Sequence, residues 1–404
     1  MTATGQRRGR ELAVLTATSL ALIFAQSVVF ASFGLVLFAI GPTLRLSASD
    51  SGFAYTIVVV GACIAAPMPM ALIRWIGGGL TIVLGQAVLC GAFLVLSDAH
   101  GLSQVYAAAL LGGIGFSLSG NSPGVFLLSG WGGARAARWI GIYMMIGMLG
   151  NAVGPPAAQA LIAGLGWRGY CVAVALVAAA MAGLCWLCLR EPPLADPGEG
   201  GRSSLRGLGG VLRSPIFLML AAAIVASQMC IITVASIAPA YLAAQGQAPA
   251  FAARLLGIEG LASALATGLL GYGVRIVPAR HLLPIALLAG AAGLAILVAS
   301  RDAVLLTGFA VLVGASVGGA TLAVTLLLVR YFGSVQGAAS LGAVWTLAGL
   351  AAFGPWFAGL IADASGSYAP AFSVIALLLL PIAGSSVLLL PRDVPDAGLL
   401  PSRG

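Results

Sequence analysis

Residues 282–300 read LLPIALLAGAAGLAILVAS and contain no charged side chain. A helix of about 20 apolar residues is long enough to cross the roughly 30 Å of hydrocarbon in a bilayer. Similar stretches recur along the chain at about 13–40, 52–73, 80–97, 102–128, 139–163, 169–189, 215–243, 251–273, 282–300, 303–329, 334–362 and 370–390. The sequence therefore predicts an all-α membrane protein with about twelve transmembrane helices.

The composition of the whole chain supports the same fold class. Of 404 residues, 60% are hydrophobic and only 7% are charged. Soluble domains carry about 25% charged residues, because their surfaces must be hydrated. A chain with so few charges cannot hydrate the surface of a soluble fold of this size, so we expect lipid to contact much of it.

All the basic residues are arginines, and their distribution predicts the topology. With the N-terminus inside, fifteen arginines fall in cytoplasmic segments, and four fall in outer loops: Arg45, Arg168, Arg254 and Arg301. Positive residues accumulate on the cytoplasmic side of membrane proteins. We therefore expect a bacterial inner-membrane protein with both termini in the cytoplasm. The arginines are scattered over short loops, so the net charge of +8 gives no indication of nucleic-acid binding.

A polar segment divides the chain into two halves. Residues 190–213, REPPLADPGEGGRSSLRGLGGVLR, are rich in proline, glycine and charge, as is typical of a linker. We predict a six-helix bundle over residues 1–189, a cytoplasmic linker over 190–213, and a second six-helix bundle over 214–404.

The two halves share features at a spacing of about 200 residues. Gly154-Pro155 corresponds to Gly354-Pro355, and Arg74 corresponds to Arg275. Weak internal similarity between two hydropathy-matched halves is typical of transporters built from repeats.

This plan resembles the major facilitator superfamily over nearly the whole chain. The run from Tyr331-Phe332-Gly333 to Gly366-Ser367-Tyr368, through Gly342, Gly349, Gly354-Pro355, Gly359 and Asp363, is similar to the monocarboxylate-carrier and oxalate/formate-antiporter families. The resemblance implies alternating access around a central cavity. In that fold the first, fourth, seventh and tenth helices line the cavity.

Glu259 is the exceptional carboxyl group of the predicted helices. An ionised side chain at the centre of a bilayer costs about 2.5–3.5 kcal/mol, so such residues are usually protonated, paired or exposed to a wet cavity. A dry setting favours the protonated form, which would suit reversible proton transport. Alternatively, Glu259 lies at the outer interface beside Arg254, or forms a structural pair between helices.

Uncharged polar residues near mid-membrane complete a candidate site for solute or proton. They are Gln26, Asn121, Asn151, Gln228, Ser263, Trp345 and Thr346. Buried polar groups need partners, so we expect these side chains to face the bundle interior or a water-filled path. For each residue alone, hydrogen bonding between helices is the competing interpretation.

Proline and glycine predict places where helices bend. Pro123 lies in Gly-Asn-Ser-Pro-Gly, and Gly154-Pro155 and Gly354-Pro355 lie within predicted helices. Proline removes a backbone donor and kinks a helix. We expect hinges at these positions, with ordinary helix packing as the alternative. Arg74 and Arg275 lie at equivalent cytoplasmic ends, and the resemblance implies that they help close the inner gate; the alternative is that they simply anchor the helices.

The sequence favours no enzymatic chemistry and no cofactor. The two histidines, His100 and His281, lie in loops, so histidine-based metal sites and catalytic triads are not expected. A phosphate-binding Gly-x-x-x-x-Gly-Lys is absent, so we do not expect ATP hydrolysis.

The leading interpretation is a monomeric secondary transporter that carries a small organic acid or related metabolite with protons. Proton-antiport efflux of a small apolar compound is the alternative, since the eighth helix between Gly257 and Gly273 lacks the arginine that the resembled carboxylate carriers often place there. A non-transporting membrane sensor is the alternative from another class.

Overall fold

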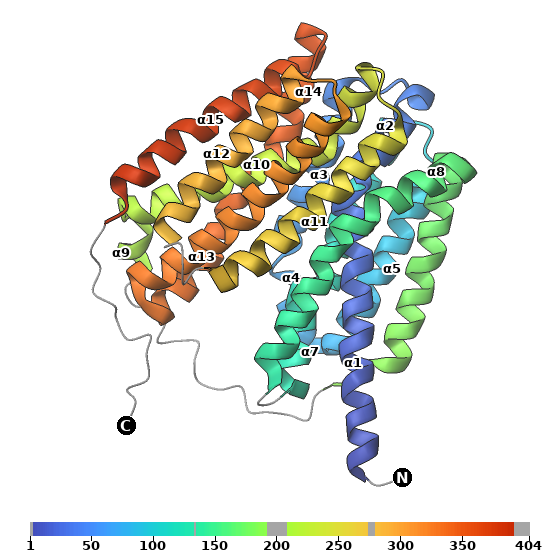
Figure 1. The fold of residues 1–404 in the computed structure, drawn as a ribbon. Coiled ribbons are helices and arrows are strands. Elements are labelled where there is room, and N and C mark those ends of the chain that lie inside the picture. The colour runs from blue at the N-terminus through green and yellow to red at the C-terminus, as the bar shows by residue number, and fades with distance from the viewer. Residues whose placement is uncertain (1–2, 133–134, 192–207, 274–278, 392–404) are drawn as a thin grey trace. The chain divides into compact units, whose positions relative to one another are not determined.

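A computed structural model describes residues 3–132, 135–191, 208–273 and 279–391 (Figure 1). Within these ranges the backbone is helical almost throughout and contains no strand. The predicted all-α fold is confirmed. Each long apolar stretch forms a helix because a helix satisfies all its backbone hydrogen bonds within the segment, as a lipid environment requires.

The described helices follow one another along the chain with short connections. The first part contains α1 (Ala3–Ala25), η1 (Gln26–Ala31), α2 (Phe33–Leu44), α3 (Ala48–Ala65), α4 (Met68–Ile76), α5 (Gly78–Ser97), α6 (Leu102–Ser119), α7 (Asn121–Gly132) and α8 (Ala136–Cys188). The second part contains α9 (Leu208–Leu212), α10 (Pro215–Ala244), α11 (Pro249–Gly273), α12 (Ala279–Ala299), α13 (Ala303–Ala348), η4 (Gly349–Phe353), α14 (Gly354–Ser365) and α15 (Ala369–Leu389).

Eleven segments of the described chain are long and apolar enough to cross a membrane. The longest, Arg138–Cys188, is two crossings joined at Gly166, whose φ of 70° and ψ of 171° are not helical. Glycine tolerates this left-handed backbone because it has no Cβ. The segment thus accounts for two of the twelve predicted helices, and the count of about twelve agrees with the structure.

Compact packing divides the chain into two units that differ from a simple cut at the linker. The first unit comprises Met1–Asp196, Ile232–Leu261 and Ala352–Tyr368, and the second comprises Pro197–Ile231, Ala262–Ala351 and Ala369–Gly404. One end of α10, one end of α11 and all of α14 therefore pack with the first six crossings. The predicted linker lies mostly outside the described residues, and the 1–189 and 214–404 bundles stay a prediction.

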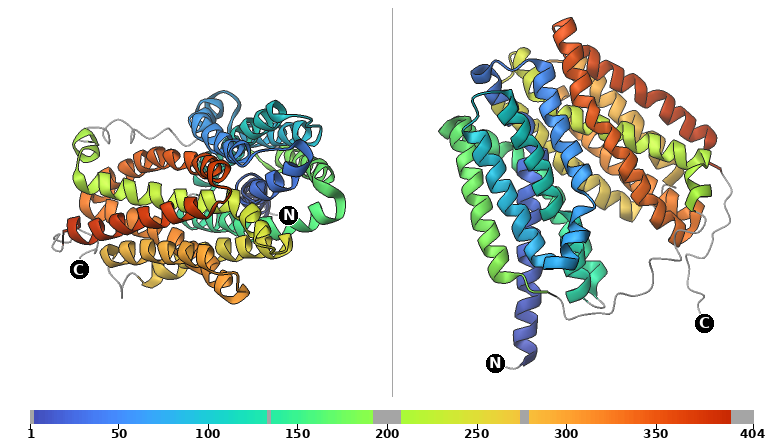
Figure 2. Two further views of the ribbon diagram at one scale, coloured as in Figure 1. Left: turned by 90° about the horizontal axis from the view of Figure 1, so that it is seen from above. Right: turned by 180° about the vertical axis from the view of Figure 1, so that it is seen from behind.

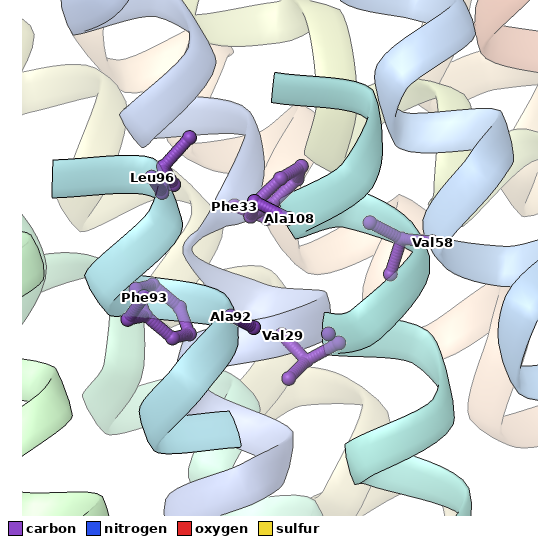
Figure 3. Close-up of a pocket in the computed structure, with 8 residues that line it drawn as sticks. Val29, Phe33, Val58, Ala92, Phe93, Leu96 and Ala108 are labelled. Atoms are coloured by element: carbon purple, nitrogen blue, oxygen red, sulfur yellow. The ribbon is translucent and has the colours of Figure 1, made fainter. Parts of the chain in front are cut away.

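In the first unit α5 packs against α6 and α8, while α3 packs against α6 and α1 against α8 (Figure 2). Aromatic and branched side chains fill the space between these helices, among them Phe33, Tyr55, Phe93 and Tyr170. A void of about 10 Å³ lies within this core, and the described residues that line it are apolar or glycine. Figure 3 shows the side chains around it, including Val29, Phe33 and Phe93. A void of that size and polarity does not hold a solute.

In the second unit α12 packs against α13 and α15 (Figures 1 and 2). The approach of α12 and α13 is close at Gly290, where an added Cβ would lie 2.6 Å from the Ser316 hydroxyl oxygen. Small residues of this kind let transmembrane helices approach and gain van der Waals contact.

Candidate functional site

Glu259 lies inside the first unit, on α11. It is 3% exposed, and its Oε1 atom has no hydrogen-bond partner among the residues that the structure describes. Arg254, one turn earlier, is exposed and lies 5.6 Å from the centre of the Phe251 ring. The carboxyl group is thus enclosed by protein and forms no ion pair with Arg254 among the described residues, and its depth in the membrane stays a prediction.

Close helix packing fixes the position of Glu259. A Cβ added to the neighbouring Gly260 would lie 2.6 Å from the carbonyl oxygen of Asn151 on α8. A Cβ on Gly257 would lie 2.7 Å from the carbonyl oxygen of Ala152. Only glycine permits this approach of α11 to α8, so the backbone on both sides of Glu259 is held against α8.

Asn151 is bonded in turn to the first transmembrane segment. The Gln26 amide donates to Asn151 Oδ1 at 3.0 Å. Next to it, the Ser27 hydroxyl lies 2.7 Å from the Ile23 carbonyl oxygen and 3.0 Å from the Gly150 carbonyl oxygen. Gln26 also begins the π-helical turn η1. Single π turns in α-helices are frequent at functional sites.

Tyr55 on α3 is a further polar neighbour that the sequence interpretation missed. It is 1% exposed, and its hydroxyl donates to the Phe30 carbonyl oxygen at 2.6 Å. The hydroxyl is also close enough to Glu259 for the two groups to interact electrostatically. We call Gln26, Tyr55, Asn151 and Glu259 the buried polar cluster.

The remaining polar candidates lie in other parts of the described chain. Asn121 is exposed at the start of α7. Gln228, Ser263, Trp345 and Thr346 belong to the second unit. There the Thr346 hydroxyl donates to the Gly342 carbonyl oxygen at 3.0 Å, and Trp345 is 43% exposed.

The predicted hinge residues take three different backbone settings. The expected bend near Pro123 is a break at Gly120, and Pro123 follows in the first turn of α7, where its missing N–H is harmless. Gly154 and Pro155 lie within α8, whose non-helical angles occur instead at Gly166.

Gly354 and Pro355 begin α14 directly after the 3-10 turn η4. The expected single helix over 334–362 is therefore interrupted before the Gly-Pro pair, where proline is well placed at a helix start.

The predicted gating arginines are only partly described. Arg74 is exposed in the last turn of α4, and its Nε donates to the Met70 carbonyl oxygen at 3.4 Å. Arg275 lies outside the described residues. The loop after α4 has no aspartate, but Glu191 accepts a hydrogen bond from the Gly79 N–H at 2.9 Å, at the start of α5.

A second polar contact, also missed by the sequence interpretation, lies at the start of α3. The carboxylate of Asp363, on α14, accepts hydrogen bonds from the N–H groups of Ala48 and Ser49 at 3.0 and 2.9 Å. Nearby, an added Cβ on Gly52 would collide with the Pro355 carbonyl, and the Thr56 hydroxyl donates to the Ala352 carbonyl oxygen at 2.6 Å. These contacts hold α3 against η4 and α14.

A comparison with protein families supplies the classification. The profile of the Major Facilitator Superfamily matches residues 18–352. The chain belongs to the major facilitator superfamily. It is therefore a multi-pass membrane transport protein and not an enzyme. No protein of curated function matches it at a significant level.

Solved structures with the same fold include members of this superfamily at low sequence identity. The nucleoside transporter NupG, as the D323A mutant, is 11% identical, with a TM-score of 0.79 over 95% of this chain and 100% of the other. A bacterial homologue of the human lysosomal transporter Spinster, inward-facing and unoccupied, is 16% identical, with a TM-score of 0.72 over 96% of each chain. Identities this low establish the shared fold and not a shared substrate.

Proposed function

We propose that this superfamily member is a proton-coupled carrier of a small organic acid or related metabolite. The observation that carries the proposal is the enclosed carboxyl group of Glu259, whose Oε1 has no hydrogen-bond donor. An ionised carboxylate with an unsatisfied oxygen in a protein interior costs several kcal/mol, so the neutral form is favoured there. Opening to water on either side would allow the proton to leave.

The neighbours of Glu259 support a coupling role. Gln26 and Asn151 link the π-helical turn to α8, and Gly260 presses α11 against Asn151. A movement of α11 relative to α8 would therefore change the surroundings of the carboxyl group and of the amide pair together. Proton release and rearrangement of the solute site would then be linked steps.

The contact of α3 with α14 supports alternating access as the mechanism. The arginine distribution predicts that the start of α3 faces outward, with both termini in the cytoplasm of a bacterial cell. Under that topology, Asp363, Gly52 and Thr56 lie in contacts that close the outer side. We propose that these contacts separate when the carrier opens outward, that Arg74 and Arg275 act at the inner side, and that the carrier works as a monomer.

A two-step experiment tests this proposal. The purified protein is first heated with organic acids, amino acids, sugars and hydrophobic amines, because a ligand of the native state raises the apparent melting temperature. The stabilising solute is then offered to proteoliposomes with an acidic exterior. Accumulation that collapses with a protonophore supports proton-coupled uptake.

Stabilisation by lipophilic amines alone would contradict the organic-acid proposal and favour efflux. Stabilisation by carboxylates without proton-driven accumulation would contradict the coupling role of Glu259.

A further inference from the structure

A cavity of about 470 Å³ lies in the first unit, apart from the buried polar cluster. The end of α2, the start of α3, part of α10 and Tyr368 line it. Its wall is mainly apolar, with a few polar groups. Small-molecule sites have this character and typically enclose about 300–1,000 Å³. One turn before the cavity, Gly34 on α2 lies directly against the backbone of Ala235 and Ser236 on α10.

Arg45 is the charged residue of the cavity wall. Its side chain is exposed and forms no hydrogen bond or ion pair with any residue that the structure describes. Its φ of 52° is the positive value that glycine or asparagine usually supplies after a helix. An arginine held in this sparsely populated conformation suggests a function for its side chain.

The acidic residues nearby are already engaged elsewhere. Asp50 accepts a hydrogen bond from the Ser47 N–H at 3.0 Å and one from the Tyr106 hydroxyl at 3.2 Å. Asp363 accepts its two bonds from the start of α3. No carboxylate is among the described residues that line the cavity, so the guanidinium of Arg45 is the charged group of its described wall, and the neighbouring carboxylates of Asp50 and Asp363 are bonded to backbone N–H groups.

The other polar groups in the wall can also donate hydrogen bonds. The Ser236 hydroxyl belongs to a side chain that is 7% exposed, and its oxygen is itself buried, with no hydrogen-bond partner among the described residues. Burial, with a smaller contribution from the Asp363 carboxylate, raises the pKa of Tyr368 to about 12, so its phenol is an O–H donor at neutral pH. Ser51 adds a third hydroxyl.

We propose that this cavity is an outer binding site for a small monocarboxylate, with Arg45 pairing with the carboxylate and the hydroxyl groups of Tyr368 and Ser51 supplying further hydrogen bonds. The apolar wall would hold the hydrocarbon part of the solute, which disfavours small inorganic anions. A cation would be repelled by Arg45, and a neutral amide would lose the charge-assisted bond. We place the cavity on the predicted outer face, where it would capture the solute before the outer contacts open. This placement and this role rest on the proposed function.

The rate of cysteine labelling inside the cavity reports whether a ligand occupies it. Ala240 lines it and takes no part in the proposed hydrogen bonds. In a full-length variant with the six native cysteines replaced, Ala240→Cys is labelled with a maleimide in the presence of butyrate or of butyramide as the neutral control. We expect butyrate to slow labelling and butyramide to have no effect.

Substitutions of Arg45 supply the decisive comparison. Arg45→Gln is expected to raise the half-protecting butyrate concentration about tenfold, as for loss of a charge-assisted hydrogen bond. Arg45→Gly should do the same, and since glycine suits a φ of 52°, misfolding would not explain the loss. Arg254→Gln, which changes an exposed arginine outside the cavity, is the matched control and should leave protection unchanged.

If butyrate protected Ala240→Cys from maleimide equally well with and without the Arg45 substitutions, the inference would be overturned. It would also be overturned if no linear carboxylate from acetate to hexanoate slowed the labelling. Proton-driven accumulation is measured separately. If the protein accumulates carboxylates but their protection of Ala240→Cys does not depend on Arg45, only the proposed cavity site is refuted. Arg45-dependent protection without accumulation would refute only the proposed function.

Discussion

The carboxylate of Asp363 accepts a hydrogen bond from the backbone N–H of Ser49 at 2.9 Å, across 314 positions of sequence. The first turn of a helix leaves its N–H groups without partners inside the helix. In α3 the Ser47 hydroxyl accepts from the Asp50 N–H, and Asp363 accepts from Ala48 and Ser49. The cap of α3 is therefore shared between its own residues and a distant helix.

Replacing Asp363 by alanine should weaken the closed contact of α3 with α14. Loss of a capping side chain costs about 1 kcal/mol, so an equilibrium between closed and separated forms would shift up to about fivefold. Thr56, 2% exposed in this contact, can be replaced by cysteine to report the change. We expect Asp363→Ala to speed maleimide labelling of Thr56→Cys.

Asp302 provides the matched control for that substitution. Its Oδ1 caps α13 from within the same segment, accepting from the Val304 and Leu305 N–H groups at 2.9 and 3.0 Å. Asp302→Ala should lower the melting temperature without changing labelling of Thr56→Cys. Equal labelling rates in the wild type and Asp363→Ala would show that the cap does not hold the contact closed.

Adding one methyl group at Gly52 should separate the same helices. The new Cβ would meet the Pro355 carbonyl oxygen and backbone, which cannot move aside like a flexible side chain. We expect Gly52→Ala to increase labelling of Thr56→Cys. Gly91→Ala on α5 is the control, since nothing lies within 4 Å of a Cβ at that position. Similar behaviour of the two variants would refute the packing argument.

Gln26 and Asn151 should be energetically coupled. Hydrogen bonds between transmembrane helices average about 0.6 kcal/mol in double-mutant cycles. Gln26→Ala and Asn151→Ala should therefore destabilise less in combination than the sum of their separate effects. Reversible unfolding in detergent measures the three variants. Additive effects within error would mean that the 3.0 Å contact contributes no stability.

Much of the fold can be predicted from the sequence, because each membrane crossing is a long apolar run whose backbone hydrogen bonds are formed within its own helix. Internal breaks are harder to predict. The sequence LIFAQSVVF at 22–30 gives no local reason for a π turn, which accompanies packing of Ser27 against α8. The break at 120–124 is visible as a Gly-Pro pattern, yet the deviation falls at Gly120 and not at Pro123.

The candidate site is less predictable, because it depends on which helix faces meet. Glu259 is conspicuous as a carboxyl group in an apolar helix, whereas Tyr55 looks like any aromatic core residue until α3 and α11 are placed. Asp363 belongs to the run that resembles the carrier families, but its partners are two backbone N–H groups, which no side-chain pattern in the sequence reveals.

Transport by the Glu259→Gln variant in proteoliposomes tests the proposed proton-coupling role of Glu259 most directly. Glutamine keeps the size of the side chain but cannot release a proton, so we expect counterflow exchange of the solute to persist and accumulation driven by a proton gradient to vanish. Glu191→Gln, which changes an exposed carboxylate just after the end of α8, should leave both activities near wild type. Proton-driven accumulation by Glu259→Gln at the wild-type level would contradict the account.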